Sequence, residues 1–284
     1  MLERKVARMR TKTESPNPEA GGRSGNCDLR PSILRKQINA HFGAVRAPLP
    51  PPRQSWYLSW KAAFEWLIAL VLLVLTFPLI ALAAILVKLT SPGPAIYRQT
   101  RVGRKGRLFT ILKFRTMLYD CEALTGPRWS VPNDPRVTWI GRLLRSSHLD
   151  ELPQLVNVLR GDMSLIGPRP ERPEFLPHLY QTIPGYPNRL AVRPGVTGLA
   201  QVNLPPDTSL ASVRLKLAYD LCYIRNLSFL LDLRILLATA LYSVGVPFRC
   251  LRPLFGAFPV EPPERVKQPL PEKQAPETKV RTAA

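Results

Sequence analysis

The sequence predicts an α-rich α+β protein, in which a kinked membrane helix precedes a small globular domain with amphipathic interfacial helices. One long stretch, Phe64–Val87, has one acid, Glu65, at its edge and is otherwise apolar on every face, which is rare in the helices of soluble cores. In residues 88–226, short apolar runs alternate with Gly/Pro turns, as in a compact domain, and Leu108–Phe114 has the pattern of a strand. Two later segments, Leu210–Tyr223 and Leu227–Val246, are predicted as helices, the second lying on a membrane surface.

The charge of the chain indicates polyanionic partners. Its 284 residues include 40 Lys and Arg against 20 Asp and Glu, which gives a formal net charge of +20. A surplus of this size favours nucleic acid, anionic lipid or phosphorylated substrates. The 4 Cys and 3 His have no zinc-finger, HExxH or redox spacing, so we expect neither a zinc site nor a disulfide scaffold.

Composition divides the chain into four segments. Residues 1–60 are basic and Pro-rich, and we expect them to form a disordered arm. Residues 61–88 contain the apolar stretch and are predicted to be the membrane-embedded helix, while residues 89–246 form the globular domain. Residues 247–284 are again rich in proline and charge, which predicts a disordered tail.

Pro78 lies in the middle of the apolar stretch and predicts a kink, because proline has no N–H to bond the carbonyl of Val74. As a helix the stretch is about 36 Å long, more than the roughly 30 Å hydrocarbon core of a bilayer. Both flanks are basic, with Lys61 before it and Lys88 after it. The positive-inside rule places both flanks on one side, as in a re-entrant helix, yet membranes also tolerate Pro-kinked spans. These patterns leave both topologies open.

Adjacent acids, Asp150 and Glu151, lie in a basic segment, Arg142–Leu159, that is predicted as a helix with a kink at Pro153. One carboxylate can attack a phosphoryl group, and the other can hold Mg²⁺ together with substrate phosphates. The alternative is a solvated helix face with ordinary ion pairs. Several basic side chains are candidates for neutralising the phosphate oxygens: Lys113, Arg115, Arg145, Arg169 and Arg193.

These motifs have a recognisable order. Over about residues 60–246 the chain resembles the bacterial sugar transferase family, the small monotopic polyprenyl-phosphate phosphoglycosyl transferases. The matching stretches are Ser91–Thr100 with Arg101, Lys113–Met117, Asn133–Val137, Gly141–Arg145, Leu149–Gln154, Asn157–Pro170, Arg193–Val202 and the segment from Tyr219 to Leu237.

The resemblance implies that the apolar stretch is a re-entrant membrane helix hairpin and that residues 89–246 form a cytoplasmic catalytic domain. It implies that Asp150 is the nucleophile, that Glu151 serves the Mg²⁺, and that Lys113, Arg145 and Arg169 surround the active site. The implied reaction transfers a sugar-1-phosphate from a UDP-sugar to polyprenyl (undecaprenyl) phosphate through a covalent intermediate and releases UMP. It would initiate polysaccharide or glycoconjugate synthesis. A direct transfer with Asp150 as general base is the alternative mechanism.

Two positions depart from the family pattern. His148 stands where the family usually has a serine before the leucine of the acidic motif, and it could alter the local hydrogen bonding. Phe77 stands where a serine often precedes the helix-breaking proline, with Thr76 one residue earlier. A hydroxyl that could satisfy carbonyls freed by Pro78 has therefore moved or gone.

The expected partners are a UDP-sugar, polyprenyl phosphate and anionic membrane lipid, at the cytoplasmic face of the bacterial inner membrane. A homodimer stays open. So do two other classes, an inactive membrane-anchored scaffold and a membrane-tethered binder of nucleic acid or another polyanion. We do not expect nucleic acid as a partner, because aromatic residues do not interleave with the basic ones and because such a binder would not explain Asp150 and Glu151.

Overall fold

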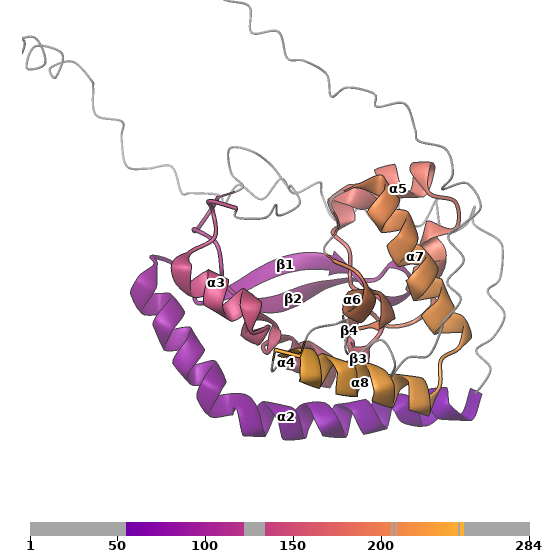
Figure 1. Cartoon of the computed structure of the whole chain (residues 1–284), viewed down its shortest axis with the longest axis horizontal. Coiled ribbons are helices and arrows are strands. Elements are labelled where there is room, and N and C mark those ends of the chain that lie inside the picture. Colours follow the sequence, from indigo (N-terminus) through magenta and orange to yellow (C-terminus); the bar gives the residue numbers. More distant parts are fainter. Residues whose placement is uncertain (1–54, 122–133, 206, 208, 244, 247–284) are drawn as a thin grey trace, which may run out of the picture.

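The computed structural model describes residues 55–121, 134–205, 207, 209–243 and 245–246 (Figure 1). Most of the predicted arm and the whole of the predicted tail from Pro247 lie outside the described residues. The helix α2 begins at Ser55, six residues before the predicted boundary at Lys61, so its first turn belongs to the segment predicted as arm.

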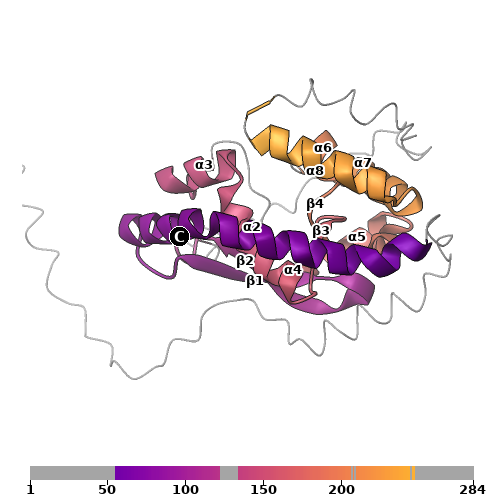
Figure 2. The same cartoon turned by 90° about the horizontal axis from the view of Figure 1, so that it is seen from below.

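The helix α2, Ser55–Thr90, is long, apolar and mostly uncovered. By length and composition it could cross a membrane: its most apolar window has a mean hydropathy of 3.0, and only 11% of that window is buried. A buried core helix of a soluble protein would show the opposite exposure. Seen from below in Figure 2, α2 passes in front of α4 and the strands, so it runs along one face of the domain.

Pro78 lies inside α2, and the two halves of the helix run in different directions (Figure 1). The hydroxyl of Thr76 donates a hydrogen bond of 2.7 Å to the carbonyl oxygen of Leu72. This bond bends helices, but it does not serve the carbonyl of Val74, which is the one that Pro78 leaves without its usual donor. The Thr76 hydroxyl therefore does not compensate for the proline.

The domain begins with an antiparallel hairpin of β1, Ile96–Val102, and β2, Leu108–Phe114. Ile96 pairs with Phe114 and Val102 pairs with Leu108, which fixes the register. The strand predicted at Leu108–Phe114 is confirmed with the same bounds. The turn between the strands contains a short 3-10 helix, Arg104–Gly106.

The predicted kinked helix over Arg142–Leu159 is wrong in detail. The segment folds as α3, Trp139–Ser146, a 3-10 turn, Leu149–Glu151, and α4, Gln154–Leu159. The first break comes before Pro153, because His148 has a φ of +56°, a left-handed conformation that ends a helix.

A second, parallel pair of strands joins β3, Ser164–Ile166, to β4, Gly195–Thr197. The amide of Gly195 donates a hydrogen bond of 3.0 Å to the carbonyl of Pro168, and that of Gly167 donates one of 2.9 Å to Thr197. A Cβ on Gly195 would lie 2.1 Å from the amide nitrogen of Gly167. The backbones approach this closely only because both positions are glycine.

We expect Gly195→Ala to lower the free energy of unfolding by about 3 kcal/mol, because the new methyl group meets backbone atoms that cannot move aside. Chemical denaturation of the detergent-solubilised protein measures this change. Gly161→Ala is the control, since its Cβ would meet nothing within 4 Å and only its φ of +77° is unfavourable, at about 1 kcal/mol. Equal losses in the two variants would contradict the close approach of β3 and β4.

The helices α5, Leu176–Thr182, and α7, Leu210–Arg225, contribute to one core that includes Leu179 and Leu217. The main core lies between the strands and the last helix, α8, Phe229–Ser243. The two C-terminal helices were predicted, and both are confirmed. The remaining elements are short: 3-10 turns at Pro173–Phe175 and Tyr186–Ala191, and α6 at Leu199–Asn203.

A buried polar cluster holds the N-terminal half of α2 to the domain. Lys61 lies within 2.6 Å of Glu65 and also pairs with Asp232 of α8. The carboxylate of Glu65 accepts hydrogen bonds from the hydroxyl of Ser164 and the amide of Ile166, both in β3. Charged groups this deeply buried need such partners, so this cluster fixes the position of α2 against β3 and α8.

Candidate active site

The acid pair, Asp150 and Glu151, lies in the 3-10 turn between α3 and α4. The left-handed residue His148 redirects the chain before the turn, and Pro153 follows it at the start of α4. Only 8% of the Asp150 surface is exposed. The two adjacent acids are therefore held in a rigid, largely covered turn rather than on a solvated helix face.

Glu151 is paired with two cations. Its Oε1 accepts hydrogen bonds from Lys113 Nζ at 2.8 Å and from Arg169 Nη2 at 2.6 Å, and its Oε2 lies 3.3 Å from Arg169 Nη1. Burial alone would raise the pKa of Glu151, but Arg169 and Lys113 outweigh it and hold that pKa well below its ordinary value. Glu151 is thus a permanently charged group in this site.

Asp150 differs from its neighbour. Within the described part of the chain, no hydrogen bond or ion pair engages its carboxylate, although Lys113, Arg169 and Arg145 all act on its charge. Burial raises the pKa of Asp150 and the charge of Glu151 adds to the effect, while the three cations act in the opposite direction. In the described part of the chain, Asp150 thus has a carboxylate with no hydrogen bond or ion pair, and three positively charged side chains act on its charge. This arrangement suits a nucleophile.

The three cations reach the acid pair from different elements. Lys113 comes from β2, Arg145 from α3 and Arg169 from the loop after β3. Arg145 Nε donates a hydrogen bond of 2.8 Å to the hydroxyl of Thr116. Burial lowers the pKa of Lys113 and the charge of Arg169 adds to this, against the opposing pull of Glu151 and Asp150. The structure therefore brings together five of the predicted site residues.

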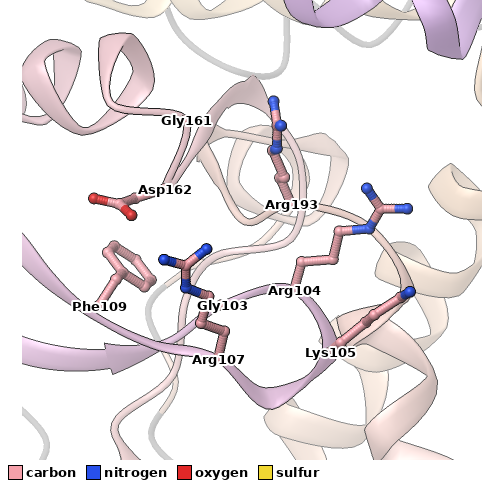
Figure 3. Close-up of a pocket in the computed structure, with 8 residues that line it drawn as sticks. All are labelled: Gly103, Arg104, Lys105, Arg107, Phe109, Gly161, Asp162 and Arg193. Carbon is pink, nitrogen blue, oxygen red and sulfur yellow. The ribbon is translucent and has the colours of Figure 1, made fainter.

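Two other predicted phosphate-binding residues lie elsewhere. The guanidinium of Arg115 donates hydrogen bonds to the carbonyls of Ser91, at 2.8 Å, and of Pro92, so it closes the C-terminal end of α2. Arg193 lines a separate cavity at the turn of the β1–β2 hairpin, which neither Asp150 nor Glu151 lines (Figure 3). Neither arginine appears among the charges that act on Asp150.

Two supporting residues were missed by the sequence analysis. Thr116 orients Arg145, and Arg189 donates a hydrogen bond of 2.8 Å to the backbone carbonyl of Arg169. Arg189 is itself paired with buried Asp220 at 2.8 Å. In the sequence, Thr116 lies within the Lys113–Met117 stretch and Arg189 lies shortly before the Arg193–Val202 stretch. The contacts that these two residues make with distant segments appear only in the folded chain.

The acid pair fits a divalent cation that also binds substrate. No group of three or more metal-ligating side chains occurs among the described residues, so a closed protein site is absent there. Glu151 Oε2 has one long contact, at 3.3 Å, and keeps lone pairs available for a ligand. Mg²⁺ typically takes one or two carboxylates and completes its shell with water and substrate phosphates.

Comparison with known proteins shows which family this chain matches. A family model described as "Bacterial sugar transferase" matches residues 56–245, which include α2 from its second residue, the acid pair and α8.

Several curated proteins are similar over most of the same region. A UDP-glucose:undecaprenyl-phosphate glucose-1-phosphate transferase of Caulobacter vibrioides is 46% identical over 183 residues, 63% of this chain and 67% of its own. A UDP-N-acetylgalactosamine-undecaprenyl-phosphate N-acetylgalactosaminephosphotransferase of Aeromonas hydrophila is 41% identical over 199 residues, 70% of this chain and 46% of its own. A glucose-1-phosphate transferase of Xanthomonas campestris pv. campestris, also acting from UDP-glucose on undecaprenyl phosphate, is 40% identical over 73% of this chain and 42% of its own. The match thus spans less than half the length of the last two relatives.

Proposed function

Because the chain belongs to the bacterial sugar transferase family, we propose that it transfers a sugar-1-phosphate from a UDP-sugar to polyprenyl (undecaprenyl) phosphate. UMP is the by-product, and the lipid-linked sugar begins a polysaccharide or glycoconjugate. One observation supports this most directly. The carboxylate of Asp150 has no hydrogen-bond partner among the described residues, and the charges of Lys113, Arg145 and Arg169 act on it. The names of the relatives agree with both substrate classes.

In the first step, a carboxylate oxygen of Asp150 attacks the β-phosphorus of the UDP-sugar. The bond from that phosphorus to the bridging oxygen breaks, and UMP leaves with the electron pair. The sugar-phosphate is then an acyl phosphate on Asp150. Lys113, Arg145 and Arg169 neutralise the negative charge that builds up on the phosphoryl oxygens.

In the second step, a phosphate oxygen of polyprenyl phosphate attacks the same phosphorus. The bond to Asp150 breaks, its carboxylate is restored, and the polyprenyl-diphosphate-sugar departs. Glu151, held by Lys113 and Arg169, stays charged throughout and does not compete as a nucleophile. The different roles of Asp150 and Glu151 in this mechanism follow from their different contacts.

Mg²⁺ is the proposed cofactor, and Glu151 is the residue that would hold it. When bound, the ion would neutralise part of the diphosphate charge of the donor. The chain's own contribution is to keep the Glu151 carboxylate ionised and fixed through Lys113 and Arg169.

We place the acid pair at the cytoplasmic surface of the inner membrane. Both halves of α2 contact the same domain: Lys61 and Glu65 reach α8 and β3, while Ala83 and Val87 pack with Phe114. A straight span would carry one half away from the domain, so this arrangement favours a re-entrant helix. α8 also exposes large apolar side chains, as an interfacial helix does: Phe229, Leu230, Leu233 and Leu237.

The test is release of UMP by the purified full chain, with a panel of UDP-sugars and undecaprenyl phosphate. We expect release from at least one donor, dependent on the lipid phosphate and stopped by a chelator of divalent cations. Absence of UMP with every donor would favour the scaffold over the enzyme.

A further inference from the structure

A basic cavity of about 280 Å³ lies at the turn of the β1–β2 hairpin. Arg104, Lys105 and Arg107 of the turn line it together with Arg193 from the segment before β4, and buried Phe109 also lines it. In Figure 3 the side chains of Arg104, Arg107 and Arg193 surround the opening. Two segments far apart in the sequence therefore bring four cations to one hollow.

These cations are not neutralised within the described part of the chain. No salt bridge there involves any of the four, and Asp162 is the single acid that lines the cavity. In the view of Figure 3 its carboxylate points away from the head groups of Arg104 and Arg193. The one hydrogen bond made by an arginine head group here runs from Arg104 Nε to the carbonyl of Ala191, at 3.2 Å. A concave surface with this charge excess attracts anions, and arginine binds phosphate oxygens in a bidentate manner.

The turn itself is conformationally constrained. Lys105 has a φ of +54° and Gly106 a φ of +76°, so two consecutive residues are left-handed. The amide of Gly103 donates a hydrogen bond of 2.8 Å to the carbonyl of Arg107 and closes the turn. A non-glycine residue in this region of backbone space is often found where a segment is held in place for binding.

The cavity is distinct from the acid pair. Asp150 and Glu151 precede α4, whereas Gly161 and Asp162, which line the cavity, follow it. The six residues of α4, Gln154–Leu159, separate the two sites by about 9 Å of helix. Since Asp150 does not line the cavity, a phosphate bound here does not contact the Asp150 carboxylate.

The cavity also lies beside the exposed apolar helix. Trp66 of α2 donates a hydrogen bond of 3.2 Å from Nε1 to the carbonyl of Leu159, two residues before Gly161. The Trp66 side chain is 46% exposed, and tryptophans on membrane helices gather at the headgroup level. With α2 in the membrane as proposed above, a cavity beside this tryptophan would lie near the lipid phosphates.

We propose that this cavity is a binding site for the phosphate group of an anionic phospholipid. The proposal rests on the proposed membrane position of α2. It extends that proposal, because a lipid bound in this cavity holds the β1–β2 hairpin at a fixed height over the bilayer. Arg193 then serves the lipid surface and not the donor diphosphate.

The test is hydrogen exchange of the turn amides, Gly103–Arg107, in the full chain reconstituted in nanodiscs. We expect exchange to be several-fold slower in phosphatidylglycerol discs than in phosphatidylcholine discs. Arg107→Gln combined with Arg193→Gln is expected to lose this slowing. The control pair, Arg98→Gln with Arg225→Gln, removes the same charge from exposed positions outside the cavity and is expected to keep it.

Two results would overturn the proposal. One is equal hydrogen exchange of the turn amides in the two lipids, and the other is slower exchange in phosphatidylglycerol discs that persists in the Arg107→Gln, Arg193→Gln variant. Equal slowing by inorganic phosphate or UMP added to phosphatidylcholine discs would assign the site to a soluble phosphate and overturn the lipid assignment. Failure to enter discs of either lipid would contradict the membrane position of α2 and the proposal with it. Absence of UMP release, with the lipid-dependent slowing of exchange preserved, would contradict the proposed reaction and not the lipid site.

Discussion

We expect Asp150→Asn to slow UMP release by roughly 10⁴-fold or more, as removal of a catalytic nucleophile does. Asparagine keeps the size of the side chain but is not a nucleophile toward phosphorus. Because no described residue bonds the Asp150 carboxylate, the substitution breaks no contact, and we expect thermal stability to be unchanged or slightly higher. UMP release and the unfolding temperature in detergent are the two measurements.

The control is Asp120→Asn, which removes an exposed carboxylate from a residue with a φ of +58°, a conformation that asparagine tolerates. It is expected to keep full activity. Turnover by Asp150→Asn close to the wild-type rate would exclude Asp150 as the nucleophile.

The same site allows a second mechanism, in which Asp150 acts as a general base in direct transfer. Both mechanisms predict a slow Asp150→Asn variant, so a different measurement separates them. In single turnover with a UDP-sugar labelled in its β-phosphate and no lipid acceptor, the covalent mechanism leaves label on the protein with release of one equivalent of UMP. Direct transfer leaves the protein unlabelled and releases no UMP until the lipid phosphate is added.

The elements that the sequence predicted are those with a strong local pattern. Leu108–Phe114 and the two C-terminal helices have continuous apolar periodicity, and all three form where expected. β1 was not predicted because only Ile96 and Val102, at its two ends, are aliphatic, and the residues between them do not alternate between apolar and polar side chains. β3 and β4 have three residues each, too few for any period to show.

The acid pair was predicted because its chemistry is local, whereas the placement of the arginines is not. Arg169 and Arg145 reach the pair, but Arg115 binds the end of α2 and Arg193 lines the hairpin cavity. Each of these placements depends on contacts between segments far apart in the chain. A basic residue in a motif therefore indicates an anion or a carbonyl nearby without saying which.

The polar cluster under α2 has a signal in the sequence. Glu65 and Asp232 are isolated acids in the two most apolar segments of the chain. An acid in such a segment must find a partner when it is buried, and here both acids meet Lys61. Paired acids in separate apolar helices thus indicate that the helices pack together.

We expect Asp232→Ala to lower the free energy of unfolding by about 3 kcal/mol, the lower end of the loss seen when one partner of a buried ion pair is removed. The Asp232 carboxylate accepts hydrogen bonds from Tyr57 at 2.6 Å and from Tyr223 at 2.8 Å, besides pairing with Lys61. Lys61 keeps Glu65 as a partner, which limits the loss. Denaturant unfolding of the detergent-solubilised chain measures it, with Asp162→Ala as the control at a less buried acid.

A double-mutant cycle separates the ion pair from mere loss of volume. Asp232→Leu combined with Lys61→Met is expected to cost less than the sum of the two single substitutions, because each single variant leaves a buried charge with fewer partners. Strict additivity would mean that the two residues do not stabilise one another. In that case the apolar contacts of α2 with the domain, and not this cluster, hold the helix in place.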